Sequence, residues 1–354
     1  MMPAVSTSHG RSSRAHRNCS RTVRLLLVGA LALLAGCSAG GADDPTARGA
    51  VPADPTAKPV HCPAATVTVD TADTLRAALT AAAPGTVIDL ADATYDGEFV
   101  VTAAGTTQAP IWLCGGRNAV LNGPGIGTGV VLHLTGSANW RLVGFTVMRG
   151  QKGVLADRVT GSIFQDLAVS QIGDEAVHLR TGSTANVVRG LTITGTGLRS
   201  QKFGEGIYVG SAVSNWCEIS SCQPDRSDGN VVAGNTITDT TAEAVDVKEG
   251  TSGGVLRDNV FNGSGLRGDA DSWVDIKGNN WLIYGNRGTS SPVSGFQTHT
   301  VAPGWGTGNV FDANIADVQG PGYGFELRPV NDNRVTCSNV AIGAGKGLTN
   351  TTCR

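Results

Sequence analysis

One short sequence phrase recurs seven times and constrains the fold of this chain more than any other feature. It reads GVLAD at Gly153, AVHLR at Ala176, GIYVG at Gly206, AVDVK at Ala244, WVDIK at Trp273, GFQTH at Gly295 and GFELR at Gly324. The phrases start 23, 30, 38, 29, 22 and 29 residues apart, and each alternates apolar and polar residues as a β-strand does. Between them lie further short apolar runs that Asn and Gly interrupt. Three short strands and three turns per ~22–30 residues predict one coil of a parallel β-helix.

Other all-β folds account less well for this repeat. The blades of a β-propeller would need a more regular period of about 40 residues or more, and the strands of a β-sandwich would not repeat one phrase. Before the repeat, Leu75, Ala78, Leu79 and Ala82 recur at helical spacing and are followed by the apolar run PGTVIDL. We therefore expect an all-β chain, a right-handed parallel β-helix with a short N-terminal capping helix.

Stacking of the coils would turn equivalent positions of the phrase into columns on the surface. Coils stack about 4.8 Å apart, so the apolar positions face inward and the polar positions face solvent. One expected outward column is His178, Tyr208, Asp246, Asp275, Gln297 and Glu326, and a parallel one is Arg180, Gly210, Lys248, Lys277, His299 and Arg328. A third column, Glu175, Glu205 and Glu243, precedes the phrase. Strict alternation would point Glu243 inward, so it can reach a ligand only from a bend in the chain.

The phrases and the cap resemble the right-handed parallel β-helix, or pectin-lyase-like, superfamily over residues 64–350. Within this likeness, EAVDVK at Glu243 and VDIKGN one coil later resemble the corresponding segment of β-helix polysaccharide lyases of the alginate lyase and chondroitinase B type. The resemblance implies Glu243 as a Ca²⁺ ligand, Lys248 as the base and Lys277 as an assisting cation. Glu205, Asp246 and Asp275 are candidates for the remaining metal ligands, because Ca²⁺ takes six to eight oxygen ligands.

These residues suit the cleavage of an acidic polysaccharide by β-elimination. The reaction needs a base near C5, positive charge on the uronate carboxylate and a proton donor for the leaving oxygen. Lys277 stacked on Lys248 would lower the pKa of Lys248, whereas Asp246 and Asp275 would oppose this unless Ca²⁺ occupies them. Arg180, Tyr208, His299 and Arg328 are further candidates for substrate binding. Two alternatives stay open: a glycoside hydrolase that uses Asp246 and Asp275, and a polysaccharide-binding or cell-surface protein without catalysis.

The interval of 38 residues holds an insertion, SAVSNWCEISSCQPDRSDG, between the Gly206 and Ala244 phrases. We expect this loop to wall one side of a groove, with Trp216 as a platform for a sugar ring, because loops on rigid scaffolds often carry function. A loop without a role in binding is the alternative.

The N-terminal region indicates export. Five arginines, a short apolar run and the sequence LAGC ending at Cys37 resemble the lipobox of bacterial lipoproteins, in which this cysteine is lipidated. An ordinary secretory peptide cut nearby is the alternative. We expect a signal peptide at 1–36, a flexible tether at 37–61 and one β-helix domain at 62–354.

Cysteine content and charge support a location outside the cytoplasm. Six further cysteines favour disulfides, and their clustering favours Cys62–Cys114, Cys217–Cys222 and Cys337–Cys353. Without residues 1–36, the chain has 22 basic and 29 acidic residues, a formal charge of −7. Such a chain lacks the basic excess that holds nucleic acid. We expect a monomer that contacts the membrane only through its lipid anchor.

Overall fold

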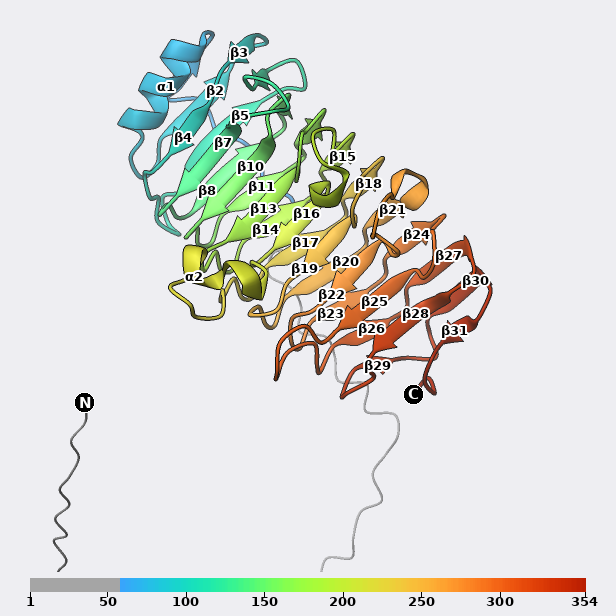
Figure 1. Cartoon of the computed structure of the whole chain (residues 1–354). Helices are drawn as coiled ribbons and strands as arrows, with labels where there is room; N and C mark the ends of the chain where they lie inside the picture. The colour runs from blue at the N-terminus through green and yellow to red at the C-terminus, as the bar shows by residue number, and fades with distance from the viewer. Residues whose placement is uncertain (1–57) are drawn as a thin grey trace, which may run out of the picture. The chain divides into compact units, whose positions relative to one another are not determined.

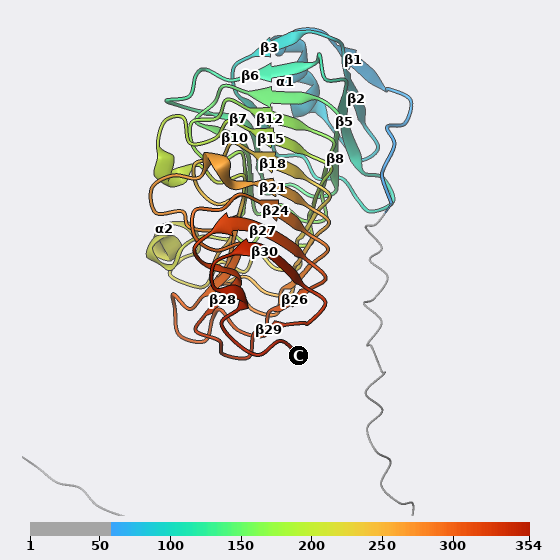
Figure 2. The same ribbon diagram turned by 90° about the vertical axis from the view of Figure 1, so that its right-hand side faces the viewer.

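The computed structural model describes residues 58–354, which form a parallel β-helix (Figure 1). Its strands stack coil on coil in three parallel sheets, and every pairing is parallel because each strand pairs with its equivalents in the coils before and after. Figure 2 shows the coils as successive layers, with the loop that carries the short helix α2 (Trp216–Ile219) projecting to one side. The predicted all-β fold is confirmed.

The three sheets are named here A, B and C. In axial order, sheet A contains β1 (Val67–Val69), β2 (Val87–Leu90), β5 (Ile111–Gly115), β8 (Trp140–Val143), β11 (Ile163–Gln165), β14 (Val187–Arg189), β17 (Val231–Ala233), β20 (Val255–Arg257), β23 (Leu282–Tyr284), β26 (Val310–Asp312) and β29 (Arg334–Val335). Sheet B contains β3 (Thr94–Asp96), β6 (Val120–Asn122), β9 (Thr146–Met148), β12 (Ala168–Ser170), β15 (Thr192–Thr194), β18 (Thr236–Thr238), β21 (Val260–Asn262), β24 (Arg287–Thr289), β27 (Ile315–Gly320) and β30 (Val340–Ala344).

Sheet C carries the seven repeated phrases. It contains β4 (Phe99–Val101), β7 (Val130–Thr135), β10 (Lys152–Asp157), β13 (Val177–Arg180), β16 (Ile207–Val209), β19 (Val245–Val247), β22 (Val274–Ile276), β25 (Phe296–His299), β28 (Tyr323–Arg328) and β31 (Gly347–Thr349).

The predicted cap is the helix α1 (Ala72–Ala81). Thr71 caps its N-terminus by accepting a hydrogen bond from the backbone N–H of Thr74, and the Thr74 side chain bonds back to Thr71, which closes a capping box. Leu75 and Leu79 are buried and join the core at the end of the solenoid. None of the helices within residues 58–354 has the length and apolar character needed to span a bilayer.

Buried asparagines reinforce the turns between sheets A and B. Asn235, Asn259, Asn286, Asn314 and Asn339 follow one another in successive coils. Asn286, for example, accepts bonds from the backbone and side-chain N–H groups of Asn259 (3.0 and 2.8 Å), and its own amide donates to Asn314 (2.9 Å). Each amide satisfies polar groups of the neighbouring coils that are shielded from water.

The described residues contain the three disulfides that the clustering favours, Cys62–Cys114, Cys217–Cys222 and Cys337–Cys353. Val60 lies within the tether that we expect at 37–61 and contacts sheet A. The backbone N–H and C=O of Val60 both bond to the side chain of Gln165 on sheet A (2.8 and 3.0 Å), which holds this segment against the solenoid. The expected signal peptide at 1–36 and Cys37 lie outside the described residues.

Candidate active site

The strand register of sheet C brings the predicted columns together. His178 pairs with Tyr208, Tyr208 with Asp246, Asp246 with Asp275, Asp275 with Gln297, and Gln297 with Glu326. The valines on either side of Asp246, Val245 and Val247, are buried in the core. The inward and outward assignment of the phrase is therefore confirmed.

The outward column is not exposed to solvent, however. Its six members are all buried: His178, Tyr208, Asp246, Asp275, Gln297 and Glu326. Asp246 is only 1% exposed. The expectation of a solvated face is wrong because coils that stack this closely place long side chains such as Lys277 over the short carboxylates of their neighbours.

Two lysines and two aspartates form a compact ion-pair network at the centre of this face. Lys248 Nζ lies 2.5 Å from Asp246 Oδ2, and Lys277 Nζ lies 2.8 Å from Asp246 Oδ1 and 2.7 Å from Asp275 Oδ2. His299 Nδ1 completes the network at 2.8 Å from Asp275 Oδ1. Each aspartate thus has two basic partners, as buried carboxylates require.

This network sets the protonation states of its members. Burial lowers the pKa of Lys248 and of Lys277, but Asp246 outweighs that effect, so both pKa values lie above the usual range for lysine. Burial raises the pKa of Asp275, but Lys277 and His299 outweigh it and hold that pKa well below its usual range. The aspartates, which we expect to oppose a lowering of the Lys248 pKa by Lys277, do so through Asp246, whose Oδ2 lies 2.5 Å from Lys248 Nζ.

Three carboxylates gather beside the network. One oxygen each of Glu205, Glu243 and Asp246 lies within 4.8 Å of the others. Oε2 of Glu205 is buried and has no hydrogen-bond partner within the described chain. Burial, followed by the Asp246 charge, raises the pKa of Glu205 well above its usual value and that of Glu243 to about 7. An unpaired buried carboxylate among other carboxylates suits a hard cation such as Ca²⁺.

Glu243 reaches this cluster because the chain bends just before β19. It is half-buried, whereas Val245, two residues on, is fully buried. Asp275, also considered as a metal ligand, is not part of the cluster, since its oxygens are bound by Lys277 and His299. The structure thus brings together three of the four candidate ligands.

Two adjoining pockets open on this face and share Glu205. The Lys248 pocket is lined by Glu205, Glu243, Asp246, Lys248, Arg267 and Lys277, among others. The Arg199 pocket includes Lys152, Glu175, His178, Arg199, Phe203 and Tyr208 in its lining. Lys248 and Tyr208 meet at the border between them, where the Lys248 ammonium lies 5.1 Å from the centre of the Tyr208 ring.

Tyr208 is held in a mostly buried position between two neighbours. Its ring packs edge-on against His178 with centroids 4.3 Å apart, and Nε2 of His178 donates to the carbonyl of Gly210 (2.9 Å). Burial and the Asp246 charge raise the pKa of Tyr208 well above its usual value, so its hydroxyl keeps its proton. Burial also lowers the pKa of His178, which leaves this imidazole neutral.

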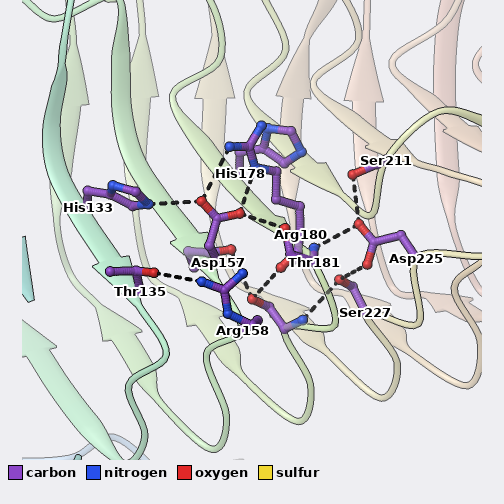
Figure 3. Close-up of polar contacts among 12 residues, drawn as sticks. His133, Thr135, Asp157, Arg158, His178, Arg180, Thr181, Ser211, Asp225 and Ser227 are labelled. Carbon is purple, nitrogen blue, oxygen red and sulfur yellow. Dashed lines mark hydrogen bonds and ion pairs between the residues drawn. The ribbon is translucent and has the colours of Figure 1, made fainter. Parts of the chain in front are cut away.

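The insertion is a fixed wall rather than a loose loop. It carries η2 (Val213–Asn215) and α2 (Trp216–Ile219), and Asn215 and Ile219 line the Arg199 pocket. Figure 3 shows how Asp225, which is fully buried, ties it to the solenoid: this carboxylate accepts bonds from the backbone N–H groups of Thr181 and Gly182 and from the hydroxyls of Ser211 and Ser227 (2.7 to 2.8 Å).

Trp216 does not line either pocket. Its indole N–H donates to the carbonyl of Ser211 (2.9 Å), and its ring packs close to Gly250. The side chain is half-buried and stabilises the base of the insertion. The structure does not place it as a sugar platform, because the indole is turned toward the solenoid.

The other predicted substrate-binding residues lie at different distances from the centre. Arg180 lines the Arg199 pocket and is bound by Asp157, which also accepts a bond from His133 (Figure 3). His299 belongs to the ion-pair network through Asp275. Arg328 is bound by Glu326 and Asp271 and lines neither pocket.

The sequence patterns did not point to Lys152, Arg199 or Phe203. Lys152 comes just before a phrase, and the other two lie between β15 and β16, outside the phrases. The one available signal was the spacing of the phrases. The phrases at Ala176 and Gly206 start 30 residues apart, whereas those at Gly153 and Ala176 start 23 residues apart, which indicates an added segment before Gly206.

Comparison with solved structures identifies two similar proteins. The alginate lyase from Paenibacillus sp. str. FPU-7 is 34% identical, with a TM-score of 0.74 over 81% of this chain and 99% of that one. Pectate lyase Pel9A is 15% identical, with a TM-score of 0.54 over 78% of each chain, and is similar in fold alone. No protein-family model matches the chain, and none of the curated proteins matches it.

Proposed function

The chain belongs to the family of the Paenibacillus alginate lyase, and on this premise we propose that it cleaves a uronate-containing polysaccharide by β-elimination. The observation that carries the proposal is the position of Lys248 and Tyr208 at the border of two pockets that hold further basic residues. A polymer that lies across both pockets would present one glycosidic bond to this pair.

The two residues have complementary roles in the proposed reaction. Lys248 removes the proton at C5, the electrons of that C–H bond form the C4–C5 double bond, and the C4–O bond breaks. Tyr208 gives its proton to the leaving oxygen, since a phenol with a raised pKa is protonated before the reaction. Lys277 stays charged and contributes positive charge near the uronate carboxylate.

Lys248 must lose its proton before it can act as a base. A cation bound by the acidic cluster of Glu205, Glu243 and Asp246 would favour this loss. Glu205, Glu243 and Asp246 are the residues that would hold Ca²⁺. When bound there, Ca²⁺ would neutralise Asp246 and the uronate carboxylate, which favours the neutral amine of Lys248 and acidifies the C5–H bond. The unpartnered Oε2 of Glu205 supports this assignment.

The ion pairs argue against the hydrolase alternative. A retaining hydrolase needs one protonated carboxylic acid beside a carboxylate nucleophile. Asp246 is bound by two ammonium groups, and the pKa of Asp275 lies well below its usual range, so Asp275 is not a proton donor at neutral pH.

The test is incubation of residues 38–354 with alginate and with other polyuronides, with and without Ca²⁺. We expect the absorbance of unsaturated uronate ends to increase. Reducing ends without unsaturation would assign hydrolysis instead, and binding without either product would assign a polysaccharide-binding protein.

We further propose that the protein works outside the cytoplasm, anchored through lipidated Cys37. Its disulfides support this location, because such bonds persist in oxidising compartments. Labelling with a fatty-acid analogue should mark the wild type and leave Cys37→Ala unlabelled. Equal labelling of both proteins would reject the anchor.

A further inference from the structure

We infer that the Arg199 pocket binds a second uronate residue, next to the one that Lys248 attacks, with Arg199 on its carboxylate and Phe203 against its ring. The inference rests on the proposed function and assigns the residues that select the polymer. Three observations support it: the position of the pocket, the anchoring and accessibility of its basic residues, and the exposure of Phe203.

The position of the pocket fixes which sugar it would hold. Tyr208 lines the Arg199 pocket, Lys248 lines the Lys248 pocket, and Glu205 lines both. A glycosidic bond at the border has one sugar on each side, so a polymer that reaches Lys248 must place its neighbouring residue over the Arg199 pocket.

The basic residues of this pocket are held in place and still accessible. Arg199 donates from Nε and Nη2 to the two oxygens of Asp174 (2.9 and 2.7 Å). These bonds use two of the five N–H donors of a guanidinium. The side chain of Arg199 is 38% exposed, whereas that of Asp174, which also lines the pocket, is 3% exposed, so the cation is the more accessible member of the pair. Lys152, paired with Glu175, lies in the same lining.

Phe203 supplies an apolar surface at the same place. It is 43% exposed, which is high for a phenylalanine, and it ends the short η1 helix (Gln201–Phe203) at the pocket. The Lys202 ammonium lies 5.8 Å from the centre of its ring. An exposed aromatic ring beside cations suits a sugar that has an apolar C–H face and a carboxylate.

The segment that carries Arg199 and Phe203 is anchored before any ligand binds. The backbone N–H of Arg199 donates to the carbonyl of Gly173 (2.8 Å), and the Thr196 hydroxyl donates to the carbonyl of Gly204 (2.5 Å). The Thr241 hydroxyl donates to the carbonyl of Gln201 (2.9 Å). A preformed binding segment avoids the entropy cost of ordering a loop on binding.

Kinetics on alginate tests the inference with Arg199→Met and Phe203→Ala. Charge-assisted hydrogen bonds of this kind correspond to about a tenfold effect or more. We expect each variant to raise KM about tenfold while kcat changes less than about threefold. The matched controls are Arg287→Met and Val260→Ala, exposed residues of sheet B, which should behave as wild type. Unchanged KM in both variants, or a lower kcat with unchanged KM, would overturn the inference.

Two further measurements separate the possible failures. Phe203→Ala breaks no ion pair, so it remains informative if Arg199→Met is unstable because Asp174 loses its partner. If wild type cleaves no polyuronide, the proposed function fails, but calorimetric titration with alginate still tests the pocket. Arg199→Met should then raise the Kd for alginate about tenfold. An unchanged Kd in both variants would reject the pocket as a uronate site.

Discussion

Lys277, which directly follows β22, reaches back over one coil to Asp246 on β19 with its Nζ 2.8 Å from Asp246 Oδ1. The same ammonium bonds Asp275 on its own strand (2.7 Å), so one buried cation links two stacked carboxylates. Together with Lys248 and His299, this bridge makes the central face of sheet C a closed network of charges rather than a row of independent surface groups.

Removal of this bridge should destabilise the protein. Lys277→Met leaves two buried carboxylates with one basic partner each, and breaking a buried pair costs about 3–5 kcal/mol. We expect a decrease of about 3 kcal/mol in the free energy of unfolding, measured with urea. Adding Asp275→Asn to this variant should restore part of the loss, because it removes one unneutralised carboxylate. A stability equal to wild type would show that Lys277 is not essential to the network.

Lys248 should be essential for turnover. Loss of a general base lowers kcat by about 10²–10⁴-fold, and we expect Lys248→Ala to fall in this range on whichever polyuronide the wild type cleaves. Lys346→Ala, an exposed lysine outside both pockets, is the control. A Lys248→Ala protein that folds and retains activity would assign the base to another residue.

The acidic cluster predicts dependence on calcium. Chelation of divalent cations should decrease lyase activity and added Ca²⁺ should restore it. Calorimetric titration with Ca²⁺ alone should detect binding to wild type and binding at least tenfold weaker to Glu243→Gln, because one charged ligand is lost. Glu218→Gln, in the exposed part of the insertion, serves as control. Activity insensitive to chelation, with no binding in the titration, would contradict a metal role for the cluster.

Asp157 should make stability depend on acidic pH. Burial raises the pKa of Asp157, but hydrogen bonds from His133, Arg180 and Thr181 outweigh it and hold the pKa well below its usual range. A carboxyl with a lowered pKa in the folded state stabilises the fold above its unfolded pKa of about 4, and the contribution is lost as the pH falls through the folded value. Urea unfolding should show Asp157→Asn to be less stable than wild type at pH 7, with the difference narrowing below about pH 4. A difference that stays constant down to pH 3 would argue against this linkage.

The ladder of buried asparagines that links successive coils, from Asn235 to Asn339, should contribute to stability in each coil. Asn286→Ala would leave the buried backbone N–H of Asn259 without its acceptor, at a cost of about 1–3 kcal/mol. Asn118→Ala, at an exposed residue bound to Asp92, should change the free energy of unfolding by less than about 0.5 kcal/mol. Equal effects of the two substitutions would show that the ladder does not add to stability.

The repeat was enough to predict the solenoid and its register. A β-strand has a side-chain period of two, and one phrase repeated seven times fixes which residues point inward, so Asp246 and Asp275 could be placed side by side. The sequence could not indicate how closely neighbouring side chains cover one another. Asp246 therefore proved to be buried, and its charge outweighs the burial of Lys248 and raises the pKa of that lysine.

The site residues that occupy positions of the repeated phrase could be predicted, whereas those on the segments between strands could not. Lys248 and Lys277 occupy equivalent phrase positions, whereas Arg199 and Phe203 lie in a connecting segment whose path is set by bonds to Gly173 and Gly204. Trp216 illustrates the same limit, since a bond to Ser211 turns its ring away from both pockets.

The sequence by itself thus determined the coils, the columns and the presence of Glu243 beside Lys248, because strand periodicity is local and repeats along the chain. Tertiary structure alone decided that Glu243 bends out to meet Glu205 and Asp246, that Asp275 is taken by Lys277 and His299, and that Tyr208 lies beside Lys248. These outcomes depend on the bends between sheets and on competition among neighbouring charges for partners, and neither is encoded in a periodic pattern.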